Sequence, residues 1–381
     1  MSTEIPVEDA GTASKPEGAS APAASRVALR ADVIVIGAGQ AGLSSAYHLK
    51  KRGLEPGRGF VVLDGSPRAG AWQFRWPSLK LSTVNRTHDL PGMRFSEAVD
   101  TDAAEVEASV AVPRYFAAYE KAFGLPVYRP VKVAVVCDRG GRLRIETDRV
   151  DFSARGVINA TCPWDGVRPG VTRRRPIRGQ ATAHEGLPDG RGVRRLARDR
   201  RRRRHLGDTA ARRGLARNHH DLGHRRPPEF RAGPFIEDRG RAAVAMVEDR
   251  VRRGPPPNSV VSVTGLPVTP AVEAMRARGV LNRLPMFEEI LEGGVRWPDG
   301  TVIRADVILL CIGFRSSLDH LAPLMLGEPG GGMTMTGRLA TEVAKDPRVH
   351  LVGYGPSAST IGANRAGAAA AKELMASLGL A

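Results

Sequence analysis

Three glycines and one aspartate stand at the spacing that dinucleotide-binding proteins use. Gly37, Gly39 and Gly42 form a G-x-G-x-x-G pattern, and Asp64 follows 22 residues after the last of them. The first glycine of such a pattern permits a tight turn, the second admits a pyrophosphate to the backbone, and the third lets helix and strand pack closely. A carboxylate at this distance can accept a hydrogen bond from a ribose hydroxyl. The chemistry predicted for these four residues is therefore dinucleotide binding.

The flanking sequence supplies the elements that would position this pattern. Residues 31–36 form a short apolar run that is typical of a buried parallel strand, and residues 43–52 have the composition of a helix. Residues 60–63 form a second apolar run, which ends directly before the aspartate. Gln40 and Ala41 lie where the helix begins, so their backbone N–H groups would be offered to the phosphates. Strand, loop, helix, strand and acid together predict an α/β, Rossmann-like domain.

The residues that follow Asp64 indicate which dinucleotide the domain would bind. The segment A-G-A-W at residues 69–72 is followed by Arg75. It resembles the G-G-x-W segment of the flavin-containing monooxygenase group of FAD enzymes, with an alanine in place of the first glycine. The resemblance implies that Gly70, Trp72 and Arg75 lie near the flavin. Packing of the tryptophan as a core aromatic is the alternative that the sequence leaves open.

Two more positions gain a role from the same resemblance. Residues 82–85 are similar to the family segment that holds an asparagine near the reacting oxygen, which makes Asn85 the candidate catalytic residue. Residues 131–137 and 143–147 predict a β-hairpin, and the resemblance places Val131, at its start, against the adenine. Turn capping by the asparagine and plain strand packing of the valine are the alternatives.

The C-terminal part of the chain resembles the return of the same FAD domain. Residues 305–315 are similar to the family crossover A-T-G-F, with Gly313 retained and a Cys-Ile pair in place of Ala-Thr. A later strand ends at Gly353 and Gly355, and Ser359 or Thr360 is the N-cap of the last helix. The resemblance implies that this strand–helix step completes the FAD site. A pure capping role for the serine is the alternative.

An arginine-rich segment interrupts this pattern. Residues 171–230 contain 18 Arg, no Lys and six acidic residues, and they supply +12 of the formal net charge of +17. The rest of the chain has 39 basic and 34 acidic residues, so the basicity is local. The resemblance would place the NADPH-domain motifs F-x-G-x-x-x-H and G-x-G-x-S-A here, and the sequence shows neither. The apolar periodicity of a strand or helix is missing as well.

A change of reading frame accounts for this segment. When each codon takes the last two bases of one residue and the first base of the next, residues 177–187 permit F-x-G-R-Q-L-H-T-K-D-Y. In the same frame, residues 193–211 permit F-A-G-S-R-V-T-V-V-G-G-G-T-S-A-T-x-Q-L, and residues 218–224 permit T-T-T-T-W-V-T. Both expected motifs then occur at the expected spacing. We interpret residues 166–224 as a frame-shifted NADPH-domain sequence.

Two other interpretations of the arginine-rich segment stay open. An arm that binds RNA or DNA is the functional alternative, although residues 171–229 contain no Phe, Tyr or Trp to stack on bases. A solvated linker is the structural alternative. In the frame-shift interpretation, Arg225 and Arg226 would hold the 2′-phosphate of NADPH, with two exposed charges as the alternative for that pair. We therefore predict no nucleic-acid partner.

The predicted organisation is an α/β flavoprotein with two dinucleotide-binding domains. Residues 1–30 are a disordered leader, and residues 31–165 are the first half of the FAD-binding domain. Residues 166–304 hold the position of an inserted NADPH domain, and residues 305–381 are the return segment of the FAD domain. As written, the inserted domain is disrupted, because it has too few large apolar residues to offset the entropy of ordering the chain. FAD is the predicted cofactor, and the resemblance adds NADPH.

The cysteine spacing and the lengths of the apolar runs argue against several other classes of protein. The three cysteines, Cys137, Cys162 and Cys311, lie far apart. This spacing argues against a zinc site, a disulfide framework or a dithiol redox pair, and it favours a reducing cytoplasm. No apolar run of the sequence approaches the length of a membrane span, about 20 residues. The expected partners are a small-molecule substrate and O₂, with no membrane, and a homodimer is compatible with the sequence.

The family resemblance implies a specific reaction. It is that of an NADPH-dependent flavoprotein monooxygenase, which inserts one oxygen atom from O₂ into a small organic substrate. A flavin reductase or dehydrogenase without oxygen transfer is the first alternative. An inactive FAD-binding remnant is the second, because the predicted NADPH site is disrupted in the sequence as written.

Overall fold

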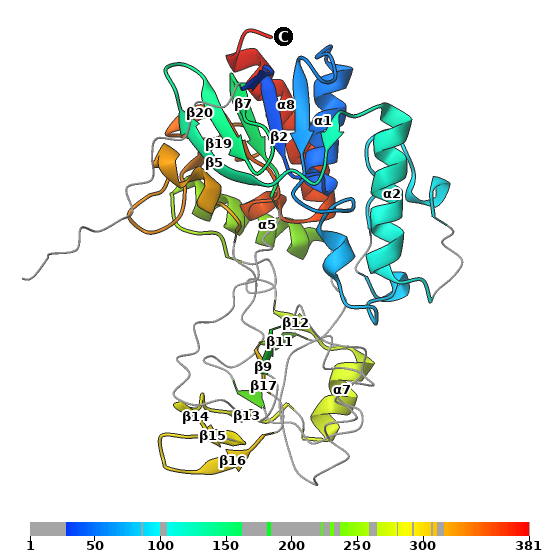
Figure 1. The fold of residues 1–381 in the computed structure, drawn as a ribbon. Helices are drawn as coiled ribbons and strands as arrows, with labels where there is room; N and C mark the ends of the chain where they lie inside the picture. The colour runs from blue at the N-terminus through cyan, green and yellow to red at the C-terminus, as the bar shows by residue number, and fades with distance from the viewer. Residues whose placement is uncertain are drawn as a thin grey trace, which may run out of the picture.

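A computed structural model gives the fold (Figure 1). The described residues are 28–84, 87–99, 105–161, 181–183, 222–223, 229–231, 237–258, 265–279, 281–291, 293–305, 308–310 and 316–380. Most of them belong to one body that is built around a central sheet.

The central sheet has seven strands in the order β18-β19-β20-β8-β2-β3-β4. The five strands from β20 to β4 run parallel, and β18 and β19 add antiparallel pairs at one edge. β2 (Val33–Ile36), β3 (Phe60–Leu63) and β8 (Gly156–Asn159) are buried along their whole length. Short apolar runs form such strands because both faces of the sheet are covered. The other strands are β4 (Val127–Tyr128), β18 (Met335–Thr336), β19 (Glu342–Val343) and β20 (Asp346–Leu351).

Two helices cover one face of this sheet. α1 (Gln40–Lys51) and α8 (Thr360–Ser377) lie side by side against it (Figure 1). The two helices approach closely, because a β-carbon at Gly367 would stand 2.9 Å from the hydroxyl oxygen of Ser44. Their buried side chains join those of β2, β3 and α2 (Ala108–Phe123) in one hydrophobic core.

A second sheet, with the order β1-β7-β6-β5, covers the opposite face. β5 (Val133–Asp138) and β6 (Leu143–Thr147) form an antiparallel hairpin, which confirms the predicted one. β1 (Leu29–Arg30), at the end of the predicted leader, pairs in parallel with β7 (Phe152–Ala154). The main body therefore has three layers: two helices, a mainly parallel sheet and an antiparallel sheet.

The described parts of residues 166–310 form short strand pairs, a three-stranded antiparallel sheet and two helices. β9 (Ala181–Ala183) pairs in parallel with β17 (Ile308–Leu310), and α5 (Glu237–Arg252) packs against the main body. α7 (Pro270–Ala277) is capped by the side chain of Thr269. The remaining strands are β10 (Leu222–Gly223), β11 (Phe230–Arg231), β12 (Leu266–Pro267), β13 (Arg283–Leu284), β14 (Glu289–Leu291), β15 (Gly294–Arg296) and β16 (Val302–Arg304). Apart from β9 and β10, the segments interpreted as frame-shifted lie outside the described residues.

Five short 3₁₀ helices complete the described structure. They are η1 (Ala71–Phe74), η2 (Leu81–Thr83), η3 (Phe95–Glu97), η4 (Asp319–Leu324) and η5 (Gly355–Ser357).

Several predicted elements have shifted ends. β3 and β6 occupy their predicted residues. α1 begins at Gln40, three residues before the predicted start, because Gly39 already serves as its N-cap. The first hairpin strand begins at Val133, two residues later than predicted.

Candidate dinucleotide-binding site

A cavity of about 640 Å³ opens at the carboxyl ends of β2, β3 and β8. Its wall is formed by the glycine loop after β2, the residues after β3, the start of β5 and the beginning of η4. In open parallel sheets, ligands bind outside the carboxyl ends of the strands. The volume lies in the range of small-molecule sites. The cavity is therefore the candidate binding site.

The three glycines of the pattern differ in backbone conformation and in what surrounds them. Gly37 has a φ of +102°, and a β-carbon there would stand 2.8 Å from the carbonyl oxygen of Ala160. A β-carbon at Gly42 would stand 1.8 Å from the carbonyl oxygen of Gly37, so only glycine fits at this turn. A β-carbon at Gly39 would meet nothing within 4 Å, although Gly39 lines the cavity. The missing side chain at Gly39 thus leaves space for a ligand rather than for the protein.

The first turn of α1 begins at this cavity, with Gly39 as its N-cap. That turn contains no acidic residue, so its free backbone N–H groups can bind an anion. Gln40 and Ala41 are both buried, and neither side chain lines the cavity. The side-chain nitrogen of Gln40 donates to the carbonyl oxygen of His88 at 3.1 Å and to Oδ1 of Asn364 at 2.9 Å. Any ligand contact of these two residues is therefore through the backbone.

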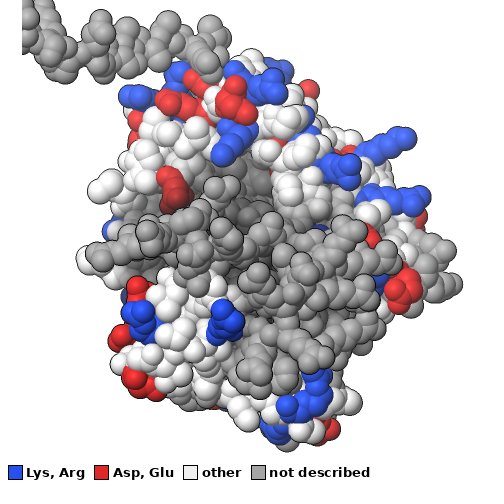
Figure 2. Space-filling model, turned by 60° about the horizontal axis from the view of Figure 1, so that its bottom comes forward, with Lys and Arg blue, Asp and Glu red and all other residues white. Residues whose placement is uncertain are grey.

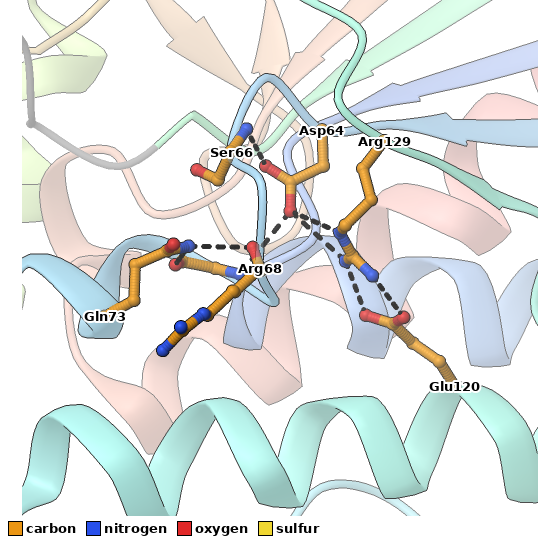
Figure 3. A network of polar contacts seen from close by, with 7 residues as sticks. Asp64, Ser66, Arg68, Gln73, Glu120 and Arg129 are labelled. Atoms are coloured by element: carbon orange, nitrogen blue, oxygen red, sulfur yellow. Dashed lines mark hydrogen bonds and ion pairs between the residues drawn. The ribbon is translucent and has the colours of Figure 1, made fainter.

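Asp64 ends β3, lines the cavity and is only 5% exposed. Its Oδ1 accepts a hydrogen bond from the backbone N–H of Ser66 at 3.1 Å. Its Oδ2 accepts from the backbone N–H of Gly70 at 3.4 Å and from Nε and Nη2 of Arg129 at 3.3 and 3.2 Å. Figure 3 shows the carboxylate between the loop that follows β3 and the guanidinium group. The predicted ribose-binding acid is thus held in a fixed polar environment.

Arg129 connects this acid to α2. It precedes β5 in the chain, and it forms two hydrogen bonds with Glu120 of α2, at 2.6 and 2.7 Å (Figure 3). Burial acts to lower the pKa of the Arg129 guanidinium, but hydrogen bonds and charge from Glu120 and Asp64 raise that pKa above its usual value. Arg129 therefore stays charged and bridges two carboxylates. Arg129 and Glu120 do not belong to the dinucleotide pattern of the sequence.

The loop that follows Asp64 is held in its conformation by Gly70 and Gln73. Gly70 has a φ of +67° and lines the cavity, and a β-carbon there would stand 3.1 Å from the ring of Phe116. Gln73 holds the loop closed, because its side-chain nitrogen donates to two loop carbonyl oxygens, each at 2.8 Å. Trp72 packs against the first hydrophobic core, with the Arg75 guanidinium 5.7 Å from the centre of its ring. The cavity wall includes Gly70 but not these last two residues.

The wall opposite the glycine loop comes from the start of the hairpin. Val131 is buried, lines the cavity, and donates its backbone N–H to the carbonyl oxygen of Asp64 at 2.9 Å. Val133 and Ala134 line the cavity as well, and β5 begins at Val133. The structure thus brings Val131 to the cavity beside the predicted ribose-binding acid.

A polar chain closes the cavity beside β8. Asn159, which is buried at the end of this strand, contacts Nε2 of His320 through its Oδ1 at 2.9 Å. Its Nδ2 donates to the hydroxyl of Thr161 at 2.9 Å, and that hydroxyl donates to the carbonyl oxygen of Ser317 at 2.7 Å. His320, Thr161 and Ser317 line the cavity. The sequence analysis did not single out His320, which is 161 residues away from its partner.

Three of the C-terminal residues assigned to the FAD site form backbone turns and a helix cap. Gly353 and Gly355 have φ values of +82° and +56°, and a β-carbon at Gly355 would stand 3.1 Å from the side chain of Val251 in α5. Ser359 caps α8, because its hydroxyl accepts from the backbone N–H of Gly362 at 3.1 Å. None of these three residues lines the cavity. The structure thus shows backbone turns and a helix cap at these positions.

Four predicted site residues lie outside the described residues: Asn85, Gly313, Arg225 and Arg226. Their roles stay predictions. Within the described ranges, no group of three His, Cys, Asp or Glu side chains could hold a metal ion. No described helix has the length and apolar character that a membrane span requires. On the face in Figure 2, the described Lys and Arg side chains are interspersed with Asp and Glu.

Sequence comparison finds relatives of the first half of the chain. A family model described as pyridine nucleotide-disulphide oxidoreductase matches residues 34–168. The uncharacterized oxidoreductase CzcO of Bacillus velezensis is 31% identical over 134 residues, which cover 35% of this chain and 36% of the relative. The match therefore spans about a third of that relative's length.

Solved structures extend the likeness over most of the chain. A doubly substituted flavin monooxygenase from Stenotrophomonas maltophilia is 26% identical, with a TM-score of 0.68, and the likeness covers 92% of this chain and 99% of that chain. The complex of OTEMO with FAD and NADP is 13% identical, with a TM-score of 0.57, and the likeness covers 91% of this chain and 85% of that chain. The second likeness is one of fold alone.

The fold and cavity define an α/β flavoprotein with a Rossmann-like dinucleotide-binding domain. Residues 34–168 match the oxidoreductase family model, and the fold of the chain is similar to that of a flavin monooxygenase.

Proposed function

We propose that the chain binds FAD in the cavity at the carboxyl ends of β2, β3 and β8. The observation that carries this proposal is the open space at Gly39, next to a helix N-terminus and within one cavity with Asp64. The residues present fit a dinucleotide: backbone N–H groups for the diphosphate and a carboxylate for a ribose hydroxyl. The OTEMO structure, whose fold is similar, was solved with FAD and NADP.

The chain's own residues bind and orient the cofactor in this proposal. The first turn of α1 holds the diphosphate, Asp64 accepts from a ribose hydroxyl, and Val131 and Val133 form an apolar wall for the adenine. The buried ends of β2 and β3 exclude water from the floor of the site. FAD, when bound, would supply the transfer of electrons from NADPH to O₂, with one oxygen atom passing to a small organic substrate and the other leaving as water.

For the chain with its reading frame restored, we place the reaction first among NADPH-dependent flavin monooxygenases. The likeness to the flavin monooxygenase from Stenotrophomonas maltophilia supports this choice, because it covers nearly all of both chains. The alternatives are a flavin reductase or dehydrogenase without oxygen transfer, and a remnant that binds FAD but is not reduced. The arginine-rich stretch of residues 171–230 favours the remnant, because the glycine loop of an NADPH domain is not legible there.

The test of the proposal begins with the flavin. The purified chain should carry flavin absorbance and release FAD on denaturation. Addition of NADPH without O₂ should bleach the flavin if NADPH is the reductant, and readmission of O₂ with candidate nucleophilic or carbonyl substrates should give a product that carries one atom of ¹⁸O from ¹⁸O₂. Bleaching without labelled product would indicate a reductase, and bound FAD without bleaching would indicate the remnant.

The setting of the enzyme is part of the proposal. The dispersed cysteines support a reducing cytoplasm, in which the partners would be O₂ and the organic substrate. A homodimer is the oligomeric state to test, and light scattering of the purified chain would measure it.

A further inference from the structure

The charged cluster beside Asp64 includes two side chains that the dinucleotide fingerprint does not contain. Arg129 lies between β4 and β5, and Glu120 lies on α2, so the cluster joins three parts of the fold. Neither side chain lines the cavity. Any effect of these two residues on a ligand therefore passes through Asp64.

The two oxygens of the Asp64 carboxylate are unequally occupied. Oδ2 accepts from the backbone N–H of Gly70 and from two nitrogens of Arg129. Oδ1 accepts from the backbone N–H of Ser66. A carboxylate offers about four acceptor positions, two on each oxygen. Oδ2 is therefore saturated, whereas Oδ1 keeps room for one more donor.

Arg129 is fixed from its other side. Its Nη1 and Nη2 lie 2.6 and 2.7 Å from the two carboxylate oxygens of Glu120, and the two side chains are 18% and 11% exposed. A planar guanidinium that bonds two carboxylates in this way cannot turn without breaking several charged hydrogen bonds. The orientation of Asp64 is thus set before a ligand arrives, which lowers the cost of ordering it on binding.

We propose that Arg129 is a positioning residue that holds Asp64 so that Oδ1 accepts a hydrogen bond from the ribose diol of the adenosine half of a dinucleotide. Glu120 fixes Arg129 in that position. The three charged groups carry a net charge of −1, so this end of the cavity suits a neutral diol and disfavours a ribose phosphate. The inference deepens the proposed function and rests on it.

The test is a calorimetric titration of the full chain, stripped of flavin, with FAD, with ADP and with 2′,3′-dideoxy-ADP. We expect the wild type to bind ADP about tenfold more tightly than the dideoxy compound, because only ADP offers the hydroxyls to Oδ1. Arg129→Met should abolish this preference and weaken FAD binding about tenfold. Arg129→Lys, which keeps the charge but loses the planar fork, should retain part of the preference.

Arg144→Met is the matched control. Arg144 lies on β6 and pairs with the buried Asp151 at 2.6 Å, so its loss removes a similar ion pair away from the cavity. The control should leave the preference for ADP unchanged. Glu120→Gln should reduce the preference in the same direction as Arg129→Met, and it carries the test if Arg129→Met fails to fold by circular dichroism.

Two outcomes overturn the inference and can be told apart. The positioning role is wrong if the preference for ADP survives in the folded Arg129 variants and in Glu120→Gln, or if it falls equally in Arg144→Met. In either case, FAD binding by the wild type still supports the proposed function. If the wild type binds neither FAD nor ADP, the proposed function fails and the inference fails with it.

Discussion

At the scale of single residues, Gly39 and Gly42 separate ligand binding from folding. Gly39→Ala places a β-carbon in open space with an extended backbone, so the unfolding free energy of the flavin-free chain should change by less than about 1 kcal/mol. FAD affinity should fall at least about tenfold, because the methyl group occupies the approach of the diphosphate. Gly42→Ala should instead destabilise the chain by roughly 3 kcal/mol or more, since its β-carbon meets a backbone oxygen.

Urea unfolding and FAD titration of the two variants measure this contrast. If the Gly39→Ala variant binds FAD as tightly as the wild type does, the diphosphate does not bind at this loop.

His350 makes stability depend on pH. It is fully buried on β20, where Nδ1 lies 3.2 Å from the Thr341 hydroxyl and Nε2 has no hydrogen-bond partner. Burial lowers its pKa from 6.5 to about 4. Between these values the unfolded chain binds a proton that the folded chain does not, so the unfolding free energy falls as the pH falls, by up to about 1.4 kcal/mol per pH unit. Above pH 6.5 this contribution is constant.

Urea midpoints at about pH 7.5 and about pH 5 test this prediction. His350→Leu should lose part of the difference between the two midpoints, whereas His88→Asn, outside the strands of the sheet, should keep it. An unchanged difference in the His350 variant would show that other groups cause the pH dependence.

At the scale of elements, the start of α8 tests whether Ser359 acts as a cap or as a ligand. Ser359→Ala removes the hydroxyl that accepts from Gly362, and loss of an N-cap costs about 1 kcal/mol of unfolding free energy. Because Ser359 lies outside the cavity wall, FAD affinity should stay within about twofold. Ser377→Ala, at the other end of the helix, is the control and should cost less. A tenfold loss of FAD affinity would instead indicate direct contact.

Sequence predicted those elements whose signals are local. The strands at residues 60–63 and 143–147 were predictable because their apolar patterns are continuous or alternating over a few residues. The glycine roles were predictable because each depends on backbone geometry within one turn. The Ser359 cap was predictable from its place before a helix.

Long-range polar contacts were not predictable in this way. Asp64, Glu120 and Arg129 are up to 65 residues apart, and Asn159 and His320 are 161 apart. Tertiary packing alone joins them, and an isolated charged residue has no periodicity that would reveal its partner. An arginine four residues before an apolar hairpin strand was the one available signal. The assignment of Trp72 and Arg75 to the flavin rested on resemblance, and the cavity wall does not include them.

At the scale of the whole molecule, the sequence likeness and the likeness of fold cover different shares of the chain. The family model matches residues 34–168, and the relative CzcO matches over 134 residues. The likeness of fold to the flavin monooxygenase covers 92% of the chain. The match to the family model ends at residue 168, close to residue 166, where the proposed change of reading frame begins. A shifted frame would remove family residues from this point on, so the end of the match agrees with the frame-shift interpretation of residues 166–224.

Restoring the frame is therefore the decisive experiment on the whole chain. The chain as written should bind FAD, but NADPH should not bleach it within minutes, because the loop for the second dinucleotide is absent from its sequence. A chain with residues 166–224 translated in the restored frame should be bleached by NADPH. The control is the restored chain with the first glycine of its new loop changed to valine, which should keep FAD and lose the rapid bleaching. Rapid bleaching of the chain as written, with its intact mass and gene sequence confirmed, would show instead that the arginine-rich segment serves the enzyme as it stands.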